Sequence, residues 1–363
     1  MAGSLSLTER VLRFIADPAA DRFDALALEV FAHQYAQNLP YRQFCDRRGV
    51  TPERVREWRR IPAVPASAFK VADLTCRPKQ PSTYFLTSGT TQGTDRRGRH
   101  IVANVALYHA AILPNAQAHL FPDLGPDGRI TILSLTPPPP HRPHSSLIHM
   151  IDRLISRWGA PGSGYVGTAA GLDADALAAA LRRAEEDGKP IALLGTTAAV
   201  ALFFAYCDER GLTFALPASS RIMDTGGAKG LGGDTTRYAD RPAFLEACRR
   251  ILNLYPRAVI NEYGMTELCS QFYAAGSASG FSIPHWVRVQ AIDPRTDDDA
   301  PAGEPGLLRH YDLANLESVM AIQTDDLGLR RTAGGRFHLL GRASGAEARG
   351  CSLDPAALSL STP

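Results

Sequence analysis

Several features that mark common protein classes are missing from this sequence of 363 residues. Its six cysteines include no CxxC pair, which argues against a zinc ribbon, a thioredoxin-like site or a disulfide framework. No apolar run reaches the length of a membrane-spanning helix, and residues 1–20 do not have the basic head and apolar stretch of a signal peptide. We therefore expect a cytoplasmic protein without a membrane span.

An excess of charge of one sign is also lacking. The formal net charge is +2, and basic residues cluster only in residues 95–99, which we interpret as a solvated turn. A surface for nucleic acid needs a larger positive excess, so no nucleic-acid partner is expected. The hydrophobic content, by contrast, is 45%, enough to bury a large core in one large domain or two smaller ones.

The first part of the chain has a helical pattern. Residues 6–9 (SLTE) have the form of a capping box, and Val11, Phe14 and Ile15 follow at helical spacing, so we expect a helix there. A second helix is expected over residues 23–37. Prolines then make residues 61–65 a connector that cannot be regular helix.

Apolar runs typical of strands follow, each ending at a loop of small residues. They cover residues 130–135, 191–194, 221–223 and 258–260. In open α/β sheets, ligands collect at the carboxyl ends of the strands. These loops therefore predict one shared binding site in an α/β protein.

The loop from Thr87 to Gly93 (TSGTTQG) has the composition of a phosphate-binding loop. Its two glycines let backbone N–H groups turn inward, and the hydroxyls of Thr87, Ser88, Thr90 and Thr91 can donate to phosphate oxygens. It is not a Walker A loop, because no Gly-Lys-Ser/Thr follows, and its glycine spacing does not fit a dinucleotide fingerprint. Taken alone, the loop is equally well explained as a polar surface turn.

Three further motifs supply complementary chemistry. Residues 263–267 (YGMTE) provide an aromatic face for a base, a hydroxyl for a phosphate and a carboxylate for Mg²⁺. Residues 324–326 (TDD) offer carboxylates for ribose hydroxyls, and Gly341-Arg342 offers a guanidinium. Each motif alone has a plainer explanation, because capped strand ends, acidic turns and exposed arginines are common.

In this order, TSGTTQG, TGGAK, EYGMTE, TDD and GR resemble the core motifs of the adenylate-forming superfamily of acyl-CoA synthetases, luciferases and nonribosomal-peptide adenylation domains. Residues 61–70, 223–227, 284–287 and 349–353 are similar, more specifically, to LuxE-type acyl-protein synthetases. The resemblance implies an α/β fold of mixed β-sheets layered with helices. It implies a catalytic domain over residues 1–330, the large N-terminal domain of these enzymes, and a short remnant of the hinge over 331–363.

The same resemblance implies an acid-AMP ligase, which uses ATP and Mg²⁺ to convert a small carboxylic acid, fatty or aromatic, into an acyl-AMP with release of pyrophosphate. Glu267 would serve Mg²⁺ and catalysis, and Arg342 would be a further catalytic residue. The implied cofactor-binding residues are Thr87, Ser88, Gly89, Thr90, Thr91, Gly226, Gly227, Ala228, Tyr263, Gly264, Thr266 and Asp326.

One departure from the superfamily concerns the positive charge at the α-phosphate. Other members continue past the Gly-Arg motif into a mobile lid domain that carries a catalytic lysine, and we expect this lid to be absent. Another cation must then offset the charge on the α-phosphate and the substrate carboxylate. Lys229, directly after Gly226-Gly227-Ala228, is the first candidate, and Arg342 is the competing one.

The acyl acceptor is left open by the sequence. LuxE-type enzymes pass the acyl group to a cysteine near their C-terminus, and Cys351 occupies such a position beside Arg349, which would lower the pKa of its thiol. Alternatively, this segment is only what remains of the hinge. An acceptor or carrier protein, CoA and water are the other acceptors, with CoA least favoured. A second hypothesis is a nucleotide-binding subunit of a fatty acid reductase complex with little activity of its own.

Overall fold

The computed structural model describes residues 5–80, 82–87, 97–227, 233–276, 280–331 and 335–343. They form two compact units. The first unit draws on Met1–Asn115, Gly264–Phe272 and Gly280–Glu347, and the second on Ala116–Tyr263 and Tyr273–Ser279. The expected division into a catalytic domain over 1–330 and a hinge remnant over 331–363 stays a prediction.

The second unit contains a parallel sheet. Its strand order is β8 (Val259–Tyr263), β7 (Arg221–Thr225), β6 (Ile191–Thr196), β4 (Thr131–Ser134) and β5 (Gly164–Tyr165), with β9 (Phe272–Ala275) beside β8. The pairings from β8 through to β5 are all parallel. The strands expected from the four apolar runs are confirmed as β4, β6, β7 and β8, and parallel pairing brings their carboxyl ends to one edge.

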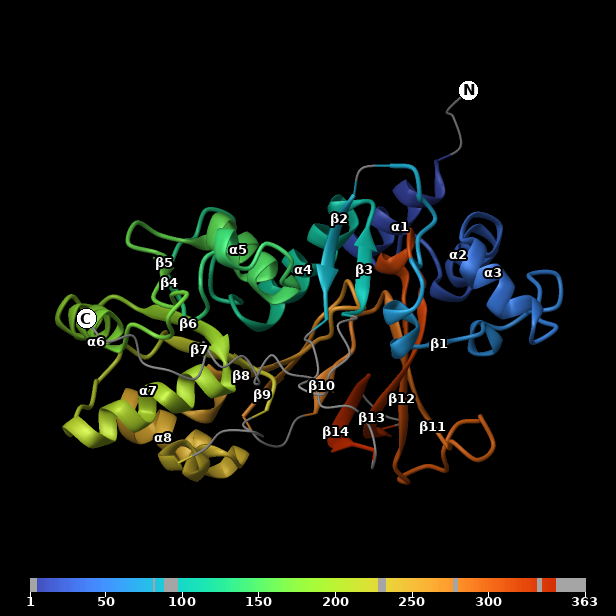
Figure 1. The fold of residues 1–363 in the computed structure, drawn as a ribbon. Coiled ribbons are helices and arrows are strands. Elements are labelled where there is room, and N and C mark those ends of the chain that lie inside the picture. Colours follow the sequence, from blue (N-terminus) through green and yellow to red (C-terminus); the bar gives the residue numbers. More distant parts are fainter. Residues whose placement is uncertain are drawn as a thin grey trace. The chain divides into compact units, whose positions relative to one another are not determined.

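Helices cover this sheet on both faces, as Figure 1 shows for α5 on one side and for α7 with α8 on the other. The helices of this unit are α5 (Ser146–Trp158), α6 (Ala174–Glu186), α7 (Thr197–Arg210) and α8 (Arg241–Leu252). Strand β6 is buried at every position, which explains its continuous apolar sequence.

The first unit is built on an antiparallel sheet. Its neighbouring strands, in order, are β11 (Val287–Ile292), β12 (Gly306–Asp312), β13 (Ala321–Arg331), β14 (Arg336–Arg342) and β10 (Phe281–Ser282), and β1 (Val64–Pro65) pairs in parallel with β13. A separate antiparallel hairpin consists of β2 (Thr83–Leu86) and β3 (Arg99–Val102). Together the two units give a mixed α/β protein, as predicted.

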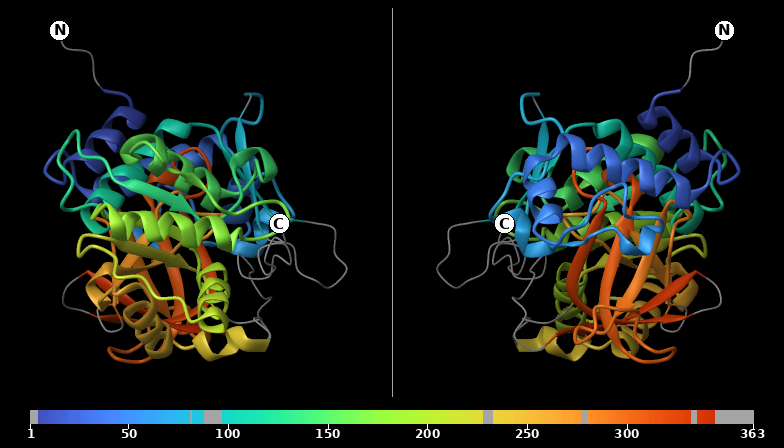
Figure 2. Two further views of the ribbon diagram at one scale, coloured as in Figure 1. Left: turned by 90° about the vertical axis from the view of Figure 1, so that its left-hand side faces the viewer. Right: turned by 90° about the vertical axis from the view of Figure 1, so that its right-hand side faces the viewer.

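Three helices, drawn in blue in Figure 2, lie beside these strands: α1 (Leu7–Ala16), α2 (Phe23–Gln37) and α3 (Leu39–Asp46). The predicted capping box of α1 is present, because Ser6 and Glu9 bond reciprocally, and the predicted bounds of α2 are confirmed. The buried Gln34 amide of α2 donates to the carbonyls of Asn315 and Leu316 at 2.9 and 3.1 Å. These bonds fix α2 to the segment that follows β12.

The remaining elements are short, apart from α4 (Val105–His119), which runs from the first unit into the second. The 3₁₀ helices are η1 (Trp58–Arg60), η2 (Ala66–Lys70), η3 (Pro139–His141), η4 (Gly233–Tyr238), η5 (Pro256–Ala258) and η6 (Leu313–Asn315).

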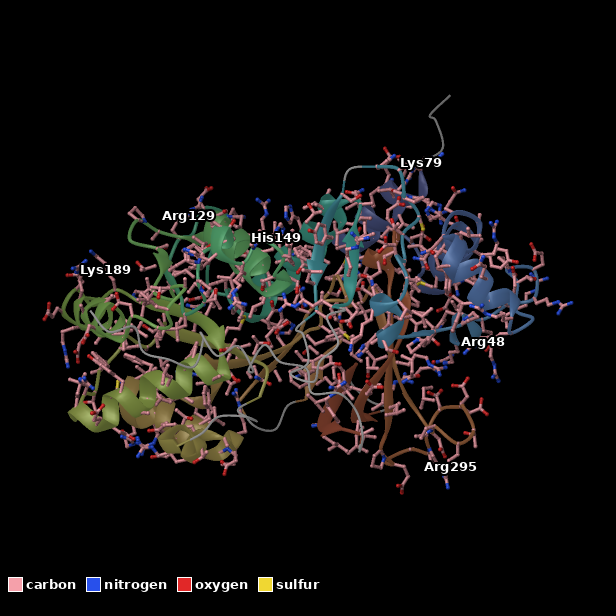
Figure 3. All side chains as sticks on the ribbon, viewed as in Figure 1. Arg48, Lys79, Arg129, His149, Lys189 and Arg295 are labelled. Atoms are coloured by element: carbon pink, nitrogen blue, oxygen red, sulfur yellow. The ribbon has the colours of Figure 1, made fainter. Side chains whose placement is uncertain are left out.

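Charged side chains are found on the exposed turns of both units. Lys189 and Arg295, labelled in Figure 3, are 76% and 86% exposed. Among the helices in the described ranges, none combines the length and the apolar character needed to cross a bilayer.

Candidate active site

The hairpin of the first unit carries Thr87, the first residue of the predicted phosphate loop, and ties it to Gly98. Beyond β2, the backbone N–H of Thr87 donates to the carbonyl of Gly98 at 2.8 Å. In return, the backbone N–H of Gly98 donates to the Thr87 hydroxyl at 2.8 Å. Since the hydroxyl accepts in this bond, it keeps its own proton for donation.

Gly98 is needed for this closure. A Cβ at this position would lie 3.0 Å from Cγ2 and 3.1 Å from Oγ1 of Thr87, closer than side chains normally approach. The next residue, Arg99, begins β3 and forms an ion pair with Asp73. The expectation of a turn over residues 95–99 is therefore wrong at Arg99, because this residue pairs with β2, although its side chain is exposed to solvent as expected.

A buried histidine connects the hairpin to the YGMTE segment. His100 on β3 is only 1% exposed, and its Nδ1 lies 2.7 Å from the carbonyl oxygen of Thr266. A carbonyl can only accept, so Nδ1 carries the proton. Burial lowers the pKa of His100 to about 4, although the bond to Thr266 opposes this shift, and the ring is neutral at physiological pH.

Asn315 fixes the backbone around Glu267, the residue of this motif that bears a carboxylate. Glu267 is 4% exposed, and its backbone carbonyl accepts from Asn315 Nδ2 at 2.8 Å. The same amide side chain accepts from the backbone N–H of Cys269 at 2.8 Å through Oδ1. Asn315 therefore fixes the backbone on which Glu267 is carried.

The TDD and GR motifs meet across two neighbouring strands. Asp326 on β13 is directly opposite Arg342 on β14. The Arg342 guanidinium donates to Asp326 Oδ1 through Nε and to Asp325 Oδ2 through Nη2, both at 3.1 Å. Its Nη1 is buried and has no hydrogen-bond partner within the described part of the chain. A buried donor of this kind is suited to an oxygen of a ligand.

In the second unit, a buried carboxylate organises the carboxyl end of β7. Asp224 is 1% exposed and accepts from Thr197 Oγ1 at 2.9 Å, from Asn261 Nδ2 at 2.9 Å and from Arg241 Nη1 at 2.6 Å. These donors come from α7, β8 and α8, so one side chain ties the strand end to three elements. The loop after β7 consequently starts from a fixed point.

That loop begins with Gly226 and Gly227. Both are exposed, and Gly226 has a φ of 77°, a left-handed conformation that favours glycine. The carbonyl of Gly226 lies 3.2 Å from the Thr197 hydroxyl. Tyr263, at the end of the neighbouring strand β8, is 8% exposed.

A second buried carboxyl group lies beside Asp224. Glu262 on β8 accepts a hydrogen bond from the Thr225 hydroxyl. Burial raises the pKa of Glu262 to about 7, with the Thr225 bond opposing the shift and the charge of Asp224 adding to it. This carboxyl group therefore changes its charge near neutral pH.

The predicted site residues are divided between the two units. Thr87, Gly264, Thr266, Glu267, Asp326 and Arg342 belong to the first, and Gly226, Gly227 and Tyr263 to the second. The remaining ones lie outside the described residues: Ser88, Gly89, Thr90, Thr91, Ala228, Lys229 and Cys351.

Sequence reasoning gave no role to the residues that position the motifs, namely His100, Asn315, Asp224, Arg241 and Glu262. Asp224 and Glu262 were inside the quoted motifs, in residues 223–227 and in EYGMTE, but were not singled out. His100, Asn315 and Arg241 belong to no motif, and only the fold brings them into contact with one.

Solved structures define the class of protein to which this fold belongs. An open conformation of 2-hydroxyisobutyryl-CoA ligase in complex with 2-HIB-AMP and CoA superimposes with a TM-score of 0.64 at 15% identity, covering 89% of this chain and 75% of that chain. McyG A-PCP, complexed with phenylalanyl-adenylate, gives a TM-score of 0.51 at 17% identity, covering 75% and 50%. The fold is that of the adenylate-forming enzymes.

The sequence narrows this class to one family. The profile described as "Acyl-protein synthetase, LuxE" matches residues 168–358, more than half of the chain, and the chain belongs to this family. It is also similar to the long-chain-fatty-acid–luciferin-component ligase of Vibrio harveyi, at 25% identity over 83% of this chain and 77% of that protein. The ligase of the same name from Aliivibrio fischeri is 23% identical over 84% and 78%. The predicted class, a ligase that adenylates a carboxylic acid, is thereby confirmed.

Proposed function

We propose that this ligase activates a fatty acid with ATP and passes the acyl group to a protein thiol. One observation carries the assignment of the site residues: the 2.7 Å bond from His100 to the Thr266 carbonyl. It joins the hairpin that bears Thr87 to the segment that bears Thr266 and Glu267. This bond supports the proposal that two motifs far apart in the sequence, each suited to phosphates, act together.

The proposed roles follow the chemistry of each side chain. The loop from Thr87 to Thr91 would orient the β- and γ-phosphates, and Thr266 would donate its hydroxyl to a phosphate. Gly226, Gly227, Ala228 and Tyr263 would hold the adenine. Asp326 would bind the ribose hydroxyls, oriented for this by its bond to Arg342 at 3.1 Å.

Glu267 is the proposed ligand for Mg²⁺. The donor set fits this ion, because Mg²⁺ is usually bound by one or two carboxylates together with phosphate oxygens and water. The backbone of Glu267, fixed by Asn315 at 2.8 Å, limits where such a carboxylate can lie. When bound, Mg²⁺ would supply positive charge against the phosphates, which the anionic substrate must approach.

The first chemical step is an in-line displacement. A carboxylate oxygen of the acid bonds to the α-phosphorus of ATP, the bond from this phosphorus to the bridging oxygen breaks, and pyrophosphate leaves with the electron pair. Negative charge accumulates on the α-phosphate and needs a cation. Lys229 is the first candidate, and the Arg342 Nη1, which is buried and has no hydrogen-bond partner among the described residues, supports Arg342 as the alternative.

The names of the relatives support a fatty acid rather than an aromatic one. Two ligases that are similar over more than three quarters of this chain are named for long-chain fatty acids. The family description, acyl-protein synthetase, supports a protein as the acceptor. In the second step a thiolate, from Cys351 in this proposal, would attack the acyl carbonyl carbon, and AMP would leave with the electrons of the broken C–O bond.

Exchange of labelled pyrophosphate into ATP tests the first step. The purified chain is assayed with fatty, benzoic and heteroaromatic acids, with and without Mg²⁺. We expect exchange that requires Mg²⁺ and is fastest with a long-chain fatty acid. Preference for an aromatic acid would contradict the proposed substrate, and no exchange with any acid would favour a nucleotide-binding subunit of a larger complex.

Variants assign the cation in the same assay. Lys229→Ala and Arg342→Ala are compared with Arg295→Ala, whose side chain is 86% exposed and pairs only with Asp293 among the described residues. The variant that lacks the α-phosphate cation should lose about 100-fold or more in exchange rate, a typical effect of removing a charge-stabilising donor. Full exchange in Lys229→Ala would exclude Lys229 from this role.

A further inference from the structure

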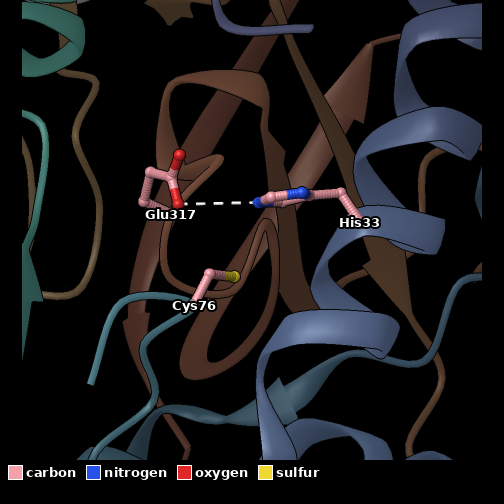
Figure 4. A group of neighbouring side chains, drawn as sticks. All are labelled: His33, Cys76 and Glu317. Carbon is pink, nitrogen blue, oxygen red and sulfur yellow. Dashed lines mark ion pairs between the residues drawn. The ribbon is translucent and has the colours of Figure 1, made fainter. Parts of the chain in front are cut away.

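Three side chains of types that can ligate a metal converge in the first unit, and none of them belongs to a sequence motif. His33 lies on α2, Cys76 lies in the segment between η2 and β2, and Glu317 is the second residue after η6. Their ligand atoms all lie within 4.8 Å of one another. Figure 4 shows the three side chains pointing toward one another, with the His33 ring directed at the Glu317 carboxylate.

The backbone around this cluster is tied together by hydrogen bonds. The N–H of Cys76 donates to the carbonyl of Glu317 at 2.9 Å, and the Ser318 hydroxyl donates to the carbonyl of Leu74 at 2.8 Å. Helix α2 is fixed to the same segment by Gln34, the residue after His33. The three side chains therefore start from positions that are fixed relative to one another.

The His33 nitrogen is poorly satisfied, whereas both Glu317 oxygens already accept hydrogen bonds from Arg77. His33 Nε2 is buried and has no hydrogen-bond partner in the described part of the protein. It lies 3.5 Å from Glu317 Oε2, a long distance for a hydrogen bond. Two ligands of one tetrahedral Zn²⁺, each about 2.0 Å from the ion, would be separated by roughly 3.3 Å. The observed spacing suits two atoms that share an ion.

The Cys76 sulfur also makes only weak contacts. Cys76 is 5% exposed, and its Sγ lies 3.8 and 3.9 Å from the carbonyls of Leu316 and Ser318, contacts that only a weak S–H donor makes. Loss of the thiol proton to water on metal binding would replace these weak contacts by a metal–sulfur bond.

We propose that His33 Nε2, Cys76 Sγ and Glu317 Oε2 form a binding site for one Zn²⁺ ion, with water as the fourth ligand. A sulfur, an imidazole nitrogen and a carboxylate oxygen are the three ligand types that Zn²⁺ takes in proteins, whereas Mg²⁺ prefers oxygen ligands. The site is therefore distinct from the proposed Mg²⁺ position at Glu267, and it does not depend on the proposed function.

Arg77 supports the proposed site by holding the Glu317 carboxylate. Its guanidinium donates to both Glu317 oxygens, with Nη2 at 3.1 Å from Oε1 and Nε at 3.0 Å from Oε2. With the metal on Oε2, the bond to Oε1 would persist and orient the carboxylate. The thiolate and the carboxylate together balance the two charges of the ion.

Metal binding by the full chain tests this proposal directly. The protein is stripped with a chelator, dialysed, and titrated with Zn²⁺ and separately with Co²⁺. We expect one equivalent of bound Zn²⁺ by elemental analysis, and a sulfur-to-cobalt charge-transfer band in the near ultraviolet. Cys76→Ser should lose the band, whereas Cys45→Ser, which removes another buried cysteine of the same unit, should keep it.

A second variant covers the case in which Cys76→Ser does not fold. His33 is 24% exposed, so His33→Gln should fold, and it should bind Co²⁺ at least about 10-fold more weakly. Absence of stoichiometric binding, a charge-transfer band that persists in Cys76→Ser, or unchanged affinity in His33→Gln would each overturn the proposal.

Discussion

His100 contacts the YGMTE segment through one bond, and its effect on ATP binding can be tested at that bond. His100→Leu removes the donor to the Thr266 carbonyl and leaves a buried acceptor unsatisfied, which should lower the free energy of unfolding by about 1–3 kcal/mol. Because Thr266 is a proposed phosphate ligand, we also expect a higher KM for ATP in pyrophosphate exchange. Both effects are measured on the same preparation.

The conservative variant separates positioning from simple stability. His100→Asn keeps an N–H donor close to the position of Nδ1. Its KM for ATP should therefore lie close to that of the unmodified chain. If His100→Leu loses stability but keeps the KM for ATP of the unmodified chain, His100 has only a structural role.

From the raised pKa of Glu262 we expect the free energy of unfolding to depend on pH in a specific way. Its pKa is raised by burial from 4.5 to about 7, so between these values the folded state binds a proton that the unfolded state has released. The contribution of this group to stability therefore falls as pH rises from about 4.5 to 7 and stays low above it. Glu262→Gln removes this loss and should be more stable than the unmodified chain above pH 7, by at most about 3 kcal/mol.

The measurement is denaturant unfolding at several pH values between 4.5 and 8. Asp312, which is also buried with a pKa raised to about 6, is unchanged in the variant, so the difference between the two curves isolates Glu262. A pH-independent difference between Glu262→Gln and the unmodified chain would contradict the raised pKa.

At the scale of elements, the β2–β3 hairpin is the part on which the phosphate loop depends. Gly98→Ala would place a Cβ about 3.0 Å from the Thr87 side chain and push Thr87, the first residue of the loop, away from Gly98. We expect pyrophosphate exchange to fall several-fold, with a loss of stability of about 1–3 kcal/mol from overpacking. Gly125→Ala is the matched control, because a Cβ there has no neighbour within 4 Å in the described structure. Equal exchange in both variants would show that the loop tolerates the displacement.

Elements with strong local patterns could be predicted from the sequence. The capping box fixed the start of α1, and the apolar runs ending in small residues located β4, β6, β7 and β8. The hairpin could not be predicted in this way, because residues 95–99 are rich in charge and glycine, a composition that indicates a turn. Its strand β3 forms because Arg99 and His100 find partners far along the chain.

In the candidate site, too, the motif residues could be predicted from the sequence, whereas the partners that position them could not. The motif residues were identified by their order, and the structure brings Asp326 and Arg342 together as cross-strand partners. Asp224 and Arg241 could not be paired from the sequence, since an ion pair between a buried and a partly exposed side chain leaves no periodic signal. The proposed metal ligands His33, Cys76 and Glu317 come from three distant segments without any ligand spacing, so a search for CxxC pairs could not find them.

At the scale of the whole molecule, the burial of the cysteines limits which thiol of the chain can accept the acyl group. The five cysteines in the described ranges are all buried: Cys45, Cys76, Cys207, Cys248 and Cys269. Burial raises the pKa of each thiol, to about 12 for the first three. A buried, protonated thiol is a poor nucleophile and is inaccessible to an acyl-adenylate. Of the six cysteines in the sequence, this leaves Cys351 as the candidate acceptor within the chain.

Intact-mass measurement after incubation with ATP, Mg²⁺ and a long-chain fatty acid tests this elimination. We expect one acyl adduct, which hydroxylamine removes, as for a thioester, and which Cys351→Ser abolishes without reducing pyrophosphate exchange. Cys45→Ser, a change at a buried thiol, should keep the adduct. If exchange is active but no adduct forms, the acceptor is a thiol of another protein or another molecule. An adduct that persists in Cys351→Ser would mean that one of the buried cysteines becomes accessible during turnover, contrary to the burial that the structure shows.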